Sequence, residues 1–436
     1  MKHPAQMRAA LMCCLVLIAP VRLHAADLVI RSAEVHTLSS NGTLARADVL
    51  VRDGKIAAVG PNLVVPSGAT VVEANGKPLT PGLFAGLTAL GIEEVSGEAA
   101  TVDEYLTLQA PAWQTQWRPE FDVTLAYNPR SVVIPVAQIE GLTWTVLTPG
   151  SASQGGSLLA GQGAAIALNG RFDAVIEGSR SLFVAIGGDA LGLSAGSRAG
   201  QYMLLDQAVR EARSTAPLEQ RSLLLPSGRE ILARYLQGGR FVFEVHRAAD
   251  IRQVLALSKR YGIKPVIAGG TEAWVVAPEL AAADVPVLVD PLVNLPASFD
   301  RIGARMDNAA LLARAGVRVG FSQAVSDVTH NARRIRQIAG NAVAQGLPWD
   351  AALAALTAIP ADIFGVGATH GRIAVGQAAD LVLWTGDPLE VTTVARQVWI
   401  GGQPLSMRSR QTELRDRYLQ RVRAGTVPGT VPVTAS

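Results

Sequence analysis

The stretch Pro81-Gly82-Leu83-Phe84-Ala85-Gly86-Leu87-Thr88-Ala89-Leu90-Gly91 decides how the rest of the chain is interpreted. It follows a segment of short strands and turns and ends on a glycine. We therefore expect it to be the first strand of a central sheet, entering a loop at its C-terminal end. Downstream of it, apolar runs alternate with amphipathic helical patterns, which predicts a parallel sheet covered by helices.

The middle of the chain, residues 81–367, carries this alternation throughout. Strands are predicted at 132–136, 141–146, 241–245, 264–268, 285–289 and 317–321, and helices at 250–261, 273–283 and 307–315. A segment of this length fits a closed TIM-type barrel of eight strand–helix units, an α/β fold. A doubly wound open sheet is the alternative, but no glycine fingerprint follows the first strand.

The two ends of the chain are rich in β patterns. Residues 27–80 contain short strands joined by tight turns, such as the pair Asp53-Gly54, and residues 368–405 contain similar strands. They predict one small composite β domain built from both termini. Residues 406–436 are expected to form a surface helix, from Glu413 to Arg423, and a flexible tail.

Residues 1–26 have the pattern of a secretory signal peptide. Basic residues precede an apolar run at 9–19, and the small residues Ala25 and Ala26 offer a cleavage site. The run is too short to span a bilayer, so export, to the periplasm in a bacterial cell, is predicted without a membrane anchor. Cleavage removes both cysteines and three positive charges, which takes the formal charge from +3 to about zero. The remaining sequence has no basic patch that would indicate a nucleic-acid partner.

The opening stretch resembles a signature of the metal-dependent amidohydrolase superfamily, Pro-Gly-Leu-Ile-Asp-x-His-x-His. In that family the two histidines bind a divalent metal at the end of the first barrel strand. Their positions here hold Leu87 and Ala89, and the preceding aspartate is Ala85. The resemblance also implies that the composite β domain is a sandwich, because many members carry one.

The other metal ligands of the family can be assigned residue by residue. The strand-five histidine corresponds to His246, the strand-six histidine to Gly269 and the strand-eight aspartate to Gln323. One ligand of five is kept, whereas a catalytic zinc normally needs three protein ligands. The sequence therefore predicts a vestigial site with no metal cofactor, although active relatives use zinc or another divalent metal.

Later motifs resemble the imidazolonepropionase-like branch of the superfamily. They include Glu94, residues 103–105, the Thr329-His330-Asn331-Ala332-Arg333 segment and residues 346–349. Glycines at 155–163 are expected to form a loop and not a phosphate cradle, because no Gly-Lys-Ser/Thr follows them.

Other candidate residues each have a structural alternative. Glu244, Glu272 and Asp290 lie at or near strand ends, where a carboxylate could act as a general acid or base, and surface or capping roles are the alternative. For His246, that alternative is a core or loop histidine. His330 and His370 have no ligand-type neighbours in sequence and are expected to be structural.

Two function hypotheses follow. By resemblance, the chain is a hydrolase acting on non-peptide or cyclic C–N (amide) bonds, with a rebuilt site and catalytic residues that the sequence does not assign. The alternative is a non-catalytic relative that binds a small-molecule ligand or pairs with an active homologue. Assembly as a homo-oligomer is left open.

Overall fold

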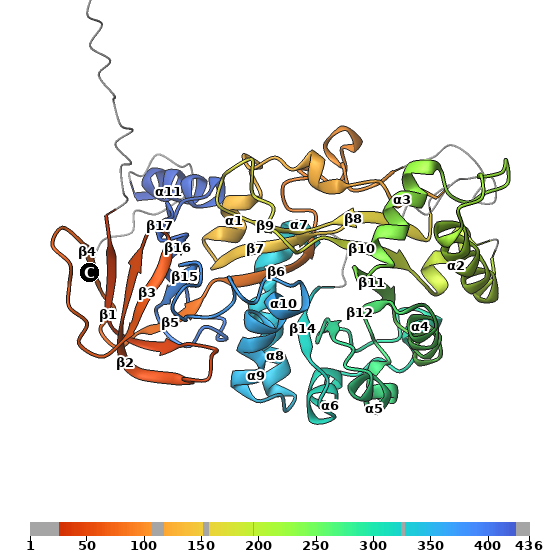
Figure 1. Cartoon of the computed structure of the whole chain (residues 1–436). Coiled ribbons are helices and arrows are strands. Elements are labelled where there is room, and N and C mark those ends of the chain that lie inside the picture. Colours follow the sequence, from red (N-terminus) through yellow and green to blue (C-terminus); the bar gives the residue numbers. More distant parts are fainter. Residues whose placement is uncertain (1–25, 107–116, 151–156, 195, 324–327, 424–436) are drawn as a thin grey trace, which may run out of the picture.

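The computed structural model describes residues 26–106, 117–150, 157–194, 196–323 and 328–423 (Figure 1). The predicted signal peptide, apart from its last residue, lies outside these ranges, as do the C-terminal tail beyond residue 423 and Gly155 and Gly156 of the glycine-rich loop. No helix within the described ranges is long and apolar enough to cross a membrane.

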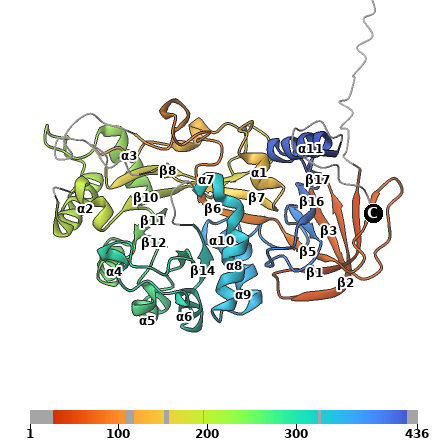
Figure 2. The same cartoon turned by 180° about the vertical axis from the view of Figure 1, so that it is seen from behind.

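Strands from both ends of the chain form one mixed sheet, called here the terminal sheet. Both views place it at one end of the molecule (Figures 1 and 2). The order is β17-β16-β15-β5-β1-β2-β3, with β4 also paired to β1. Its strands are β1 (Leu28–His36), β2 (Thr43–Arg52), β3 (Lys55–Gly60), β4 (Thr70–Glu73), β5 (Pro78–Pro81), β15 (Leu381–Trp384), β16 (Ala395–Ile400) and β17 (Gln403–Pro404).

Turn residues give this sheet its shape. Asp53 and Gly54 both have positive φ, as a two-residue hairpin between β2 and β3 requires. The start of β3 also bonds to the segment that precedes β15: Ile56 N donates to Gln377 O at 2.9 Å, and Ile56 O accepts from Gly376 N at 2.8 Å. Apolar side chains of both chain ends pack inside it, among them Ile30, Val49, Leu381 and Trp399.

The stretch from Pro81 to Gly91 joins the terminal sheet to the central strands. Pro81 still pairs with Leu381 of β15, and β6 (Leu83–Thr88) begins two residues later. Gly82 lies between them where a side chain would overlap that of Thr143 on β7, so only glycine fits without displacement. The stretch is therefore a strand, as predicted, and it fixes the junction.

Two further sheets make up the centre of the molecule. One has the order β14-β13-β12-β11-β10-β8, and the other has the order β6-β7-β9. The strands are β7 (Leu142–Leu147), β8 (Leu159–Gly163), β9 (Ala165–Ala167), β10 (Ser181–Ala185), β11 (Arg240–Val245), β12 (Lys264–Gly269), β13 (Val287–Val289) and β14 (Val319–Phe321). Strands β10 to β14 are parallel and follow in chain order, unlike the reversed order of a doubly wound sheet.

The prediction of a closed ring of eight parallel strands is wrong in two respects. First, β8 runs antiparallel to β10, and β9 runs antiparallel to β7. Only residues 148–158 separate β7 from β8, whereas a parallel return usually needs a longer crossover containing a helix. Second, no ladder joins β14 to β6 in the described part of the chain. Gly86, with φ +94°, lies in β6 where the pairing of β6 with β7 shifts register, and the amide of Leu87 donates to the Ser322 hydroxyl at 3.0 Å.

Side chains from both central sheets nevertheless fill one interior. Phe84 of β6, Trp144 of β7, Phe183 of β10, Val242 of β11 and Leu288 of β13 belong to a single buried cluster. The rings of Phe84 and Trp144 lie 4.5 Å apart. The centre is therefore a packed core, as in TIM-barrel-like folds, and not an open channel.

Helices surround these strands (Figure 1). They are α1 (Ile134–Gln138), α2 (Arg198–Arg213), α3 (Pro226–Tyr235), α4 (Ala248–Tyr261), α5 (Ala277–Ala282), α6 (Asn308–Arg314), α7 (Val328–Asn331), α8 (Ile335–Ala344), α9 (Trp349–Ala355), α10 (Ala358–Ile363) and α11 (Arg410–Arg423). The strand predicted at 132–136 is wrong, because this segment begins α1. Pro135 lies in the first turn of that helix, where its missing N–H is not needed.

Candidate functional site

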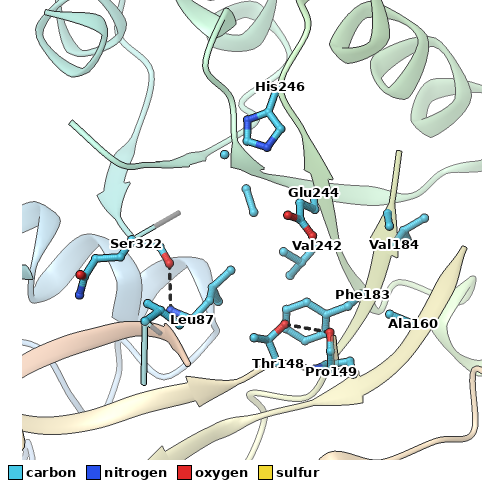
Figure 3. Close-up of a pocket in the computed structure, with 15 residues that line it drawn as sticks. Leu87, Thr148, Pro149, Ala160, Phe183, Val184, Val242, Glu244, His246 and Ser322 are labelled. Atoms are coloured by element: carbon cyan, nitrogen blue, oxygen red, sulfur yellow. Dashed lines mark hydrogen bonds between the residues drawn. The ribbon is translucent and has the colours of Figure 1, made fainter. Parts of the chain in front are cut away.

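A pocket of about 220 Å³ opens at the C-terminal ends of the central strands (Figure 3). Four of the five predicted site residues line it together, namely Leu87, His246, Gly269 and Gln323. Ala89 is not among the lining residues; it is buried, and its amide donates to the Thr329 hydroxyl at 3.1 Å. The remaining lining residues are Thr148, Pro149, Ala160, Phe183, Val184, Ala185, Val242, Glu244, Ala268, Ser322 and Val328.

The alternation of side chains along β11 places every second one from Val242 onward in this pocket. Side chains alternate between the two faces of a strand, so residues two apart share a face. Val242, Glu244 and, just past the end of the strand, His246 all line the pocket in this way. The residues between them pack against the surrounding helices.

His246 is buried and both ring nitrogens are occupied. Its Nε2 lies 3.1 Å from Arg301 Nη2, and its Nδ1 lies 2.8 Å from the Thr271 hydroxyl. A guanidinium can only donate, so Nε2 accepts and the proton sits on Nδ1, which donates to Thr271. Burial, reinforced by the Arg301 charge, lowers the pKa of His246 to about 4. The imidazole is therefore neutral near pH 7.

A buried ionic network holds Arg301 in this position. The preceding residue, Asp300, accepts from Gly188 N and from Arg198 Nη2. Arg198 also donates through Nε to Asp250 at 3.1 Å, and Asp250 accepts from the Tyr202 hydroxyl. The loop after β10, helix α4 and the turn containing Arg301 are thereby tied together beside the pocket.

Gly269 lies directly against the imidazole ring of His246. A Cβ added at this residue would lie 2.8 Å from His246 Nδ1 and closer still to its Cε1. The backbone φ of +86° is also one that side-chain-bearing residues rarely adopt. The present position of His246 therefore excludes a second histidine at 269.

The side chain of Gln323 donates hydrogen bonds to the backbone of the segment that follows β14. Its side-chain amide donates to Asn331 O at 3.0 Å and to Ala332 O at 3.2 Å. The neighbouring Ser322 hydroxyl accepts from the amide of Leu87, as described above. These contacts anchor the end of β14 to helix α7 and to β6.

Of the three candidate carboxylates, only Glu244 lines the pocket. Its side chain is exposed to the cavity but enclosed by the protein body, and this desolvation raises its pKa; Asp189 acts in the same direction and Arg301 opposes it. Glu272 accepts from Ala248 N and Gly303 N, both at 3.0 Å, and so caps helix α4.

The remaining predicted residues lie elsewhere. Asp290 accepts from Leu292 N in the turn after β13. His330 lies 3.8 Å from Glu93 and His370 lies 3.8 Å from Asp380, so each has a carboxylate that is distant in sequence. Within the described ranges, no group of three or more His, Cys, Asp and Glu side chains could hold a metal ion.

Sequence reasoning missed Arg301 and the network behind it. Arg301 follows β13 by twelve residues and lies in a short 3-10 turn, Phe299–Arg301, with no local motif. Only Asp250, in the first turn of a predicted helix, carried a recognisable signal. The contact between Arg301 and His246 joins residues 55 positions apart and arises from the tertiary fold alone.

Comparison with known proteins finds similarity to amidohydrolases in part of the sequence. A family model described as the amidohydrolase family matches residues 307–406. The amidohydrolase tasK of Hapsidospora irregularis is 44% identical over 72 residues, which is 16% of this chain and only 7% of the length of that protein. The match is thus confined to a small part of that curated relative.

Solved structures extend the likeness to the whole fold. An amidohydrolase from Thermotoga maritima MSB8 superposes with a TM-score of 0.75 at 24% identity, covering 87% of this chain and 100% of that one. A second solved amidohydrolase gives 0.53 at 18% identity, covering 87% of this chain and 99% of that one. Residues 307–406 thus match the amidohydrolase family, and the fold as a whole is shared with solved amidohydrolases.

Proposed function

We propose that this chain is a metal-independent member of the superfamily that binds a small organic ligand in the pocket at the strand ends. The observation that carries the proposal is the contact between Arg301 Nη2 and His246 Nε2. The one imidazole kept from the family's ligand set has its lone pair engaged by a side chain of the chain itself. The cavity beside it stays open to a ligand.

The residues at the family's metal positions do not fit a divalent cation. Leu87, Ala89 and Gly269 have no side-chain atom that can coordinate a metal. The amide nitrogen of Gln323 donates to two backbone carbonyls, which fixes the orientation of that side chain. A cation approaching His246 would also have to displace the guanidinium of Arg301, which repels it. We therefore derive no hydrolytic step through a metal.

Measuring the metal content tests the proposal that the protein is metal-independent. We expect the purified chain, dialysed against zinc or manganese, to retain less than stoichiometric metal by elemental analysis, and His246→Ala to leave that amount unchanged. His330→Ala is the matched control, because it removes an imidazole that does not line the pocket. One tightly held metal per chain, lost with His246→Ala but not with His330→Ala, would overturn it.

Ligand-observed NMR with a chemically mixed fragment set tests the proposal that the pocket binds a ligand. We expect some fragments to bind, and Ala160→Phe, which fills the cavity with a ring, to abolish their binding. Fragments that bind equally well to wild type and Ala160→Phe would show that the pocket is not the site. Absence of any binder would overturn the binding function.

A hydrolase of non-peptide or cyclic C–N bonds is the second candidate. Glu244 favours it, because a carboxyl group with a raised pKa inside a pocket suits general acid–base work. The test is turnover of simple amides, lactams and cyclic ureides by the metal-free chain. Activity that is lost in Glu244→Gln would make this the function; no turnover leaves the binding proposal in place.

Export and pairing with an active homologue stay predictions from the sequence. N-terminal mass analysis of the protein recovered from the periplasm checks the first, with the expected start at Ala26 or Asp27. Analytical ultracentrifugation of the purified chain, alone and with a homologue that keeps all five ligands, checks the second. A single sedimenting species at the monomer mass in both samples would contradict pairing.

A further inference from the structure

The carboxylate of Glu244 has no hydrogen-bond or ion-pair partner in the described part of the chain. The other acidic groups around the pocket do have partners: Asp300 accepts from Gly188 and Arg198, and Glu272 caps α4. Glu244 instead projects from β11 into the cavity (Figure 3). A carboxylate that faces a cavity and has no protein partner can pair with a ligand, and the pairing gains most where the ligand excludes water from the cavity.

Several other polar groups of the pocket already have hydrogen-bond partners within the protein. Both nitrogens of His246 are bonded, and the Gln323 amide donates to backbone carbonyls. The Ser322 hydroxyl accepts from Leu87 N. Among the charged groups that line the pocket in the described part of the chain, the one left without a partner is an acceptor, the Glu244 carboxylate. An ammonium group offers three donors and no acceptor, which complements it.

Charges near the pocket also favour a cation. Beyond the lining residues, burial raises the pKa of the Tyr105 hydroxyl, and the carboxylates Glu104, Glu93 and Glu244 raise it further. The negative charge of Asp189 likewise raises the pKa of Glu244. Arg301 is the opposing cation, and its guanidinium is already turned to His246 and to Asp189, at 3.6 Å. The excess of negative charge would draw in a positively charged ligand.

Most of the remaining lining is apolar, and this determines the polarity expected for the rest of the ligand. Leu87, Phe183, Val184, Val242 and Ala268 surround the cavity. Its volume of about 220 Å³ is below the range of roughly 300–1,000 Å³ typical of sites for drug-sized molecules. The ligand body must therefore be compact and apolar.

We propose that the pocket recognises a small organic cation, a protonated primary amine with a compact apolar body, whose ammonium group pairs with Glu244. This inference rests on the binding function proposed above and specifies its ligand class. Glu244 is then the specificity-determining residue, and His246, fixed by Arg301 and Thr271, shapes the wall beside it.

Three compounds of the same size test the charge requirement. Isothermal titration calorimetry at neutral pH and fixed ionic strength compares benzylamine, which is protonated, with neutral benzyl alcohol and anionic benzoate. We expect benzylamine to bind the full chain at least about tenfold more tightly than either of the others, the ratio that one charge-assisted hydrogen bond supplies.

Variants assign that preference to one residue. Glu244→Gln should weaken benzylamine binding about tenfold or more and leave benzyl alcohol nearly unchanged. Glu244→Asp keeps the charge and should keep the preference for the amine. Glu177→Gln makes the same chemical change on an exposed residue outside the pocket and should have no effect. Thermal melts of all variants verify that they are folded.

The outcomes separate this inference from the binding function. Equal or tighter binding of benzyl alcohol or benzoate, abolished by Ala160→Phe, would overturn the cation inference and support the pocket as a binding site. An amine preference unchanged in Glu244→Gln would also overturn it. If none of the three compounds binds while other uncharged fragments do, the inference fails and the binding function stands.

Discussion

The pocket and the terminal sheet each hold a carboxyl group whose pKa is raised by burial, but only one of the two groups is partnered. In the terminal sheet, Asp380 accepts from Gly401 N at 2.7 Å and lies 3.8 Å from His370 Nε2. In the pocket, Glu244 faces an open cavity. A raised pKa thus fails to distinguish a structural carboxyl group from a ligand-binding one; the presence of a partner and of free space distinguishes them.

Removing the C-terminal strands is expected to have the largest effect. A chain truncated after Gly371 loses β15, β16 and β17, and β5 is left with an unpaired edge next to the exposed core around Ile30 and Val49. We expect an insoluble chain or one without a cooperative thermal transition. A truncated protein that melts cooperatively would show that the terminal sheet contributes less to stability than the central strands.

Breaking the ionic network beside the pocket should come next. Asp300→Ala leaves Arg198 without one of its two carboxylates and Gly188 N without its acceptor, which should cost about 3 kcal/mol of unfolding free energy. Urea denaturation measures it. Glu230→Ala, which removes a carboxylate in an exposed pair with Arg234, is the control and should cost under about 1 kcal/mol. Equal effects would mean that the network contributes no more than a surface pair.

Removing the partnered carboxyl group of the terminal sheet should have a moderate effect. Asp380→Ala leaves Gly401 N without an acceptor, and we expect a loss of about 1–3 kcal/mol in the free energy of unfolding. Asp380→Asn keeps an acceptor oxygen and should lose less. If the two variants were equally unstable, the hydrogen bond to Gly401 would not be the cause.

The pH dependence of stability should reveal His246. Its folded-state pKa of about 4 lies below the ordinary value of 6.5, so below pH 6.5 the unfolded chain takes up a proton that the folded chain does not. Its contribution to stability is therefore complete above pH 6.5 and is lost progressively as the pH falls towards 4. His246→Gln, which can accept from Arg301 and donate to Thr271, should flatten the fall in melting temperature between pH 7 and 5. An unchanged slope would contradict a neutral, buried imidazole.

The smallest effect is expected at the unpartnered carboxyl group. Glu244→Gln removes a charge that has no hydrogen-bond or ion-pair partner in the described part of the chain, so stability should change by less than about 1 kcal/mol or rise slightly. The contrast with Asp380→Ala in the same urea titration sharpens the comparison. A loss for Glu244→Gln as large as that for Asp380→Ala would mean that Glu244 has a structural partner in the folded chain.

Much of the architecture could be predicted because it depends on local patterns. The strands at 241–245 and 264–268 and the helix at 250–261 follow from runs and periodicities of neighbouring residues, and the structure contains all three. The segment at 132–136 was misassigned because a short apolar run does not distinguish a strand from the start of a buried helix. The absence of a ladder between β14 and β6 in the described part of the chain could not be predicted, because pairing between strands so far apart in sequence depends on tertiary packing and not on a local pattern.

The sequence by itself determined which side chains stand at these strand ends, among them Leu87 and Gly269, which carry no side-chain atom that could coordinate a metal. Strand direction then brings these residues to one face, because parallel strands share a C-terminal edge. Only the tertiary structure decided that Arg301 engages His246, that the imidazole covers Gly269, and that Glu244 has open space before it. Such contacts join residues far apart in the chain, and their geometry is set by the packing of whole elements, which no local sequence pattern encodes.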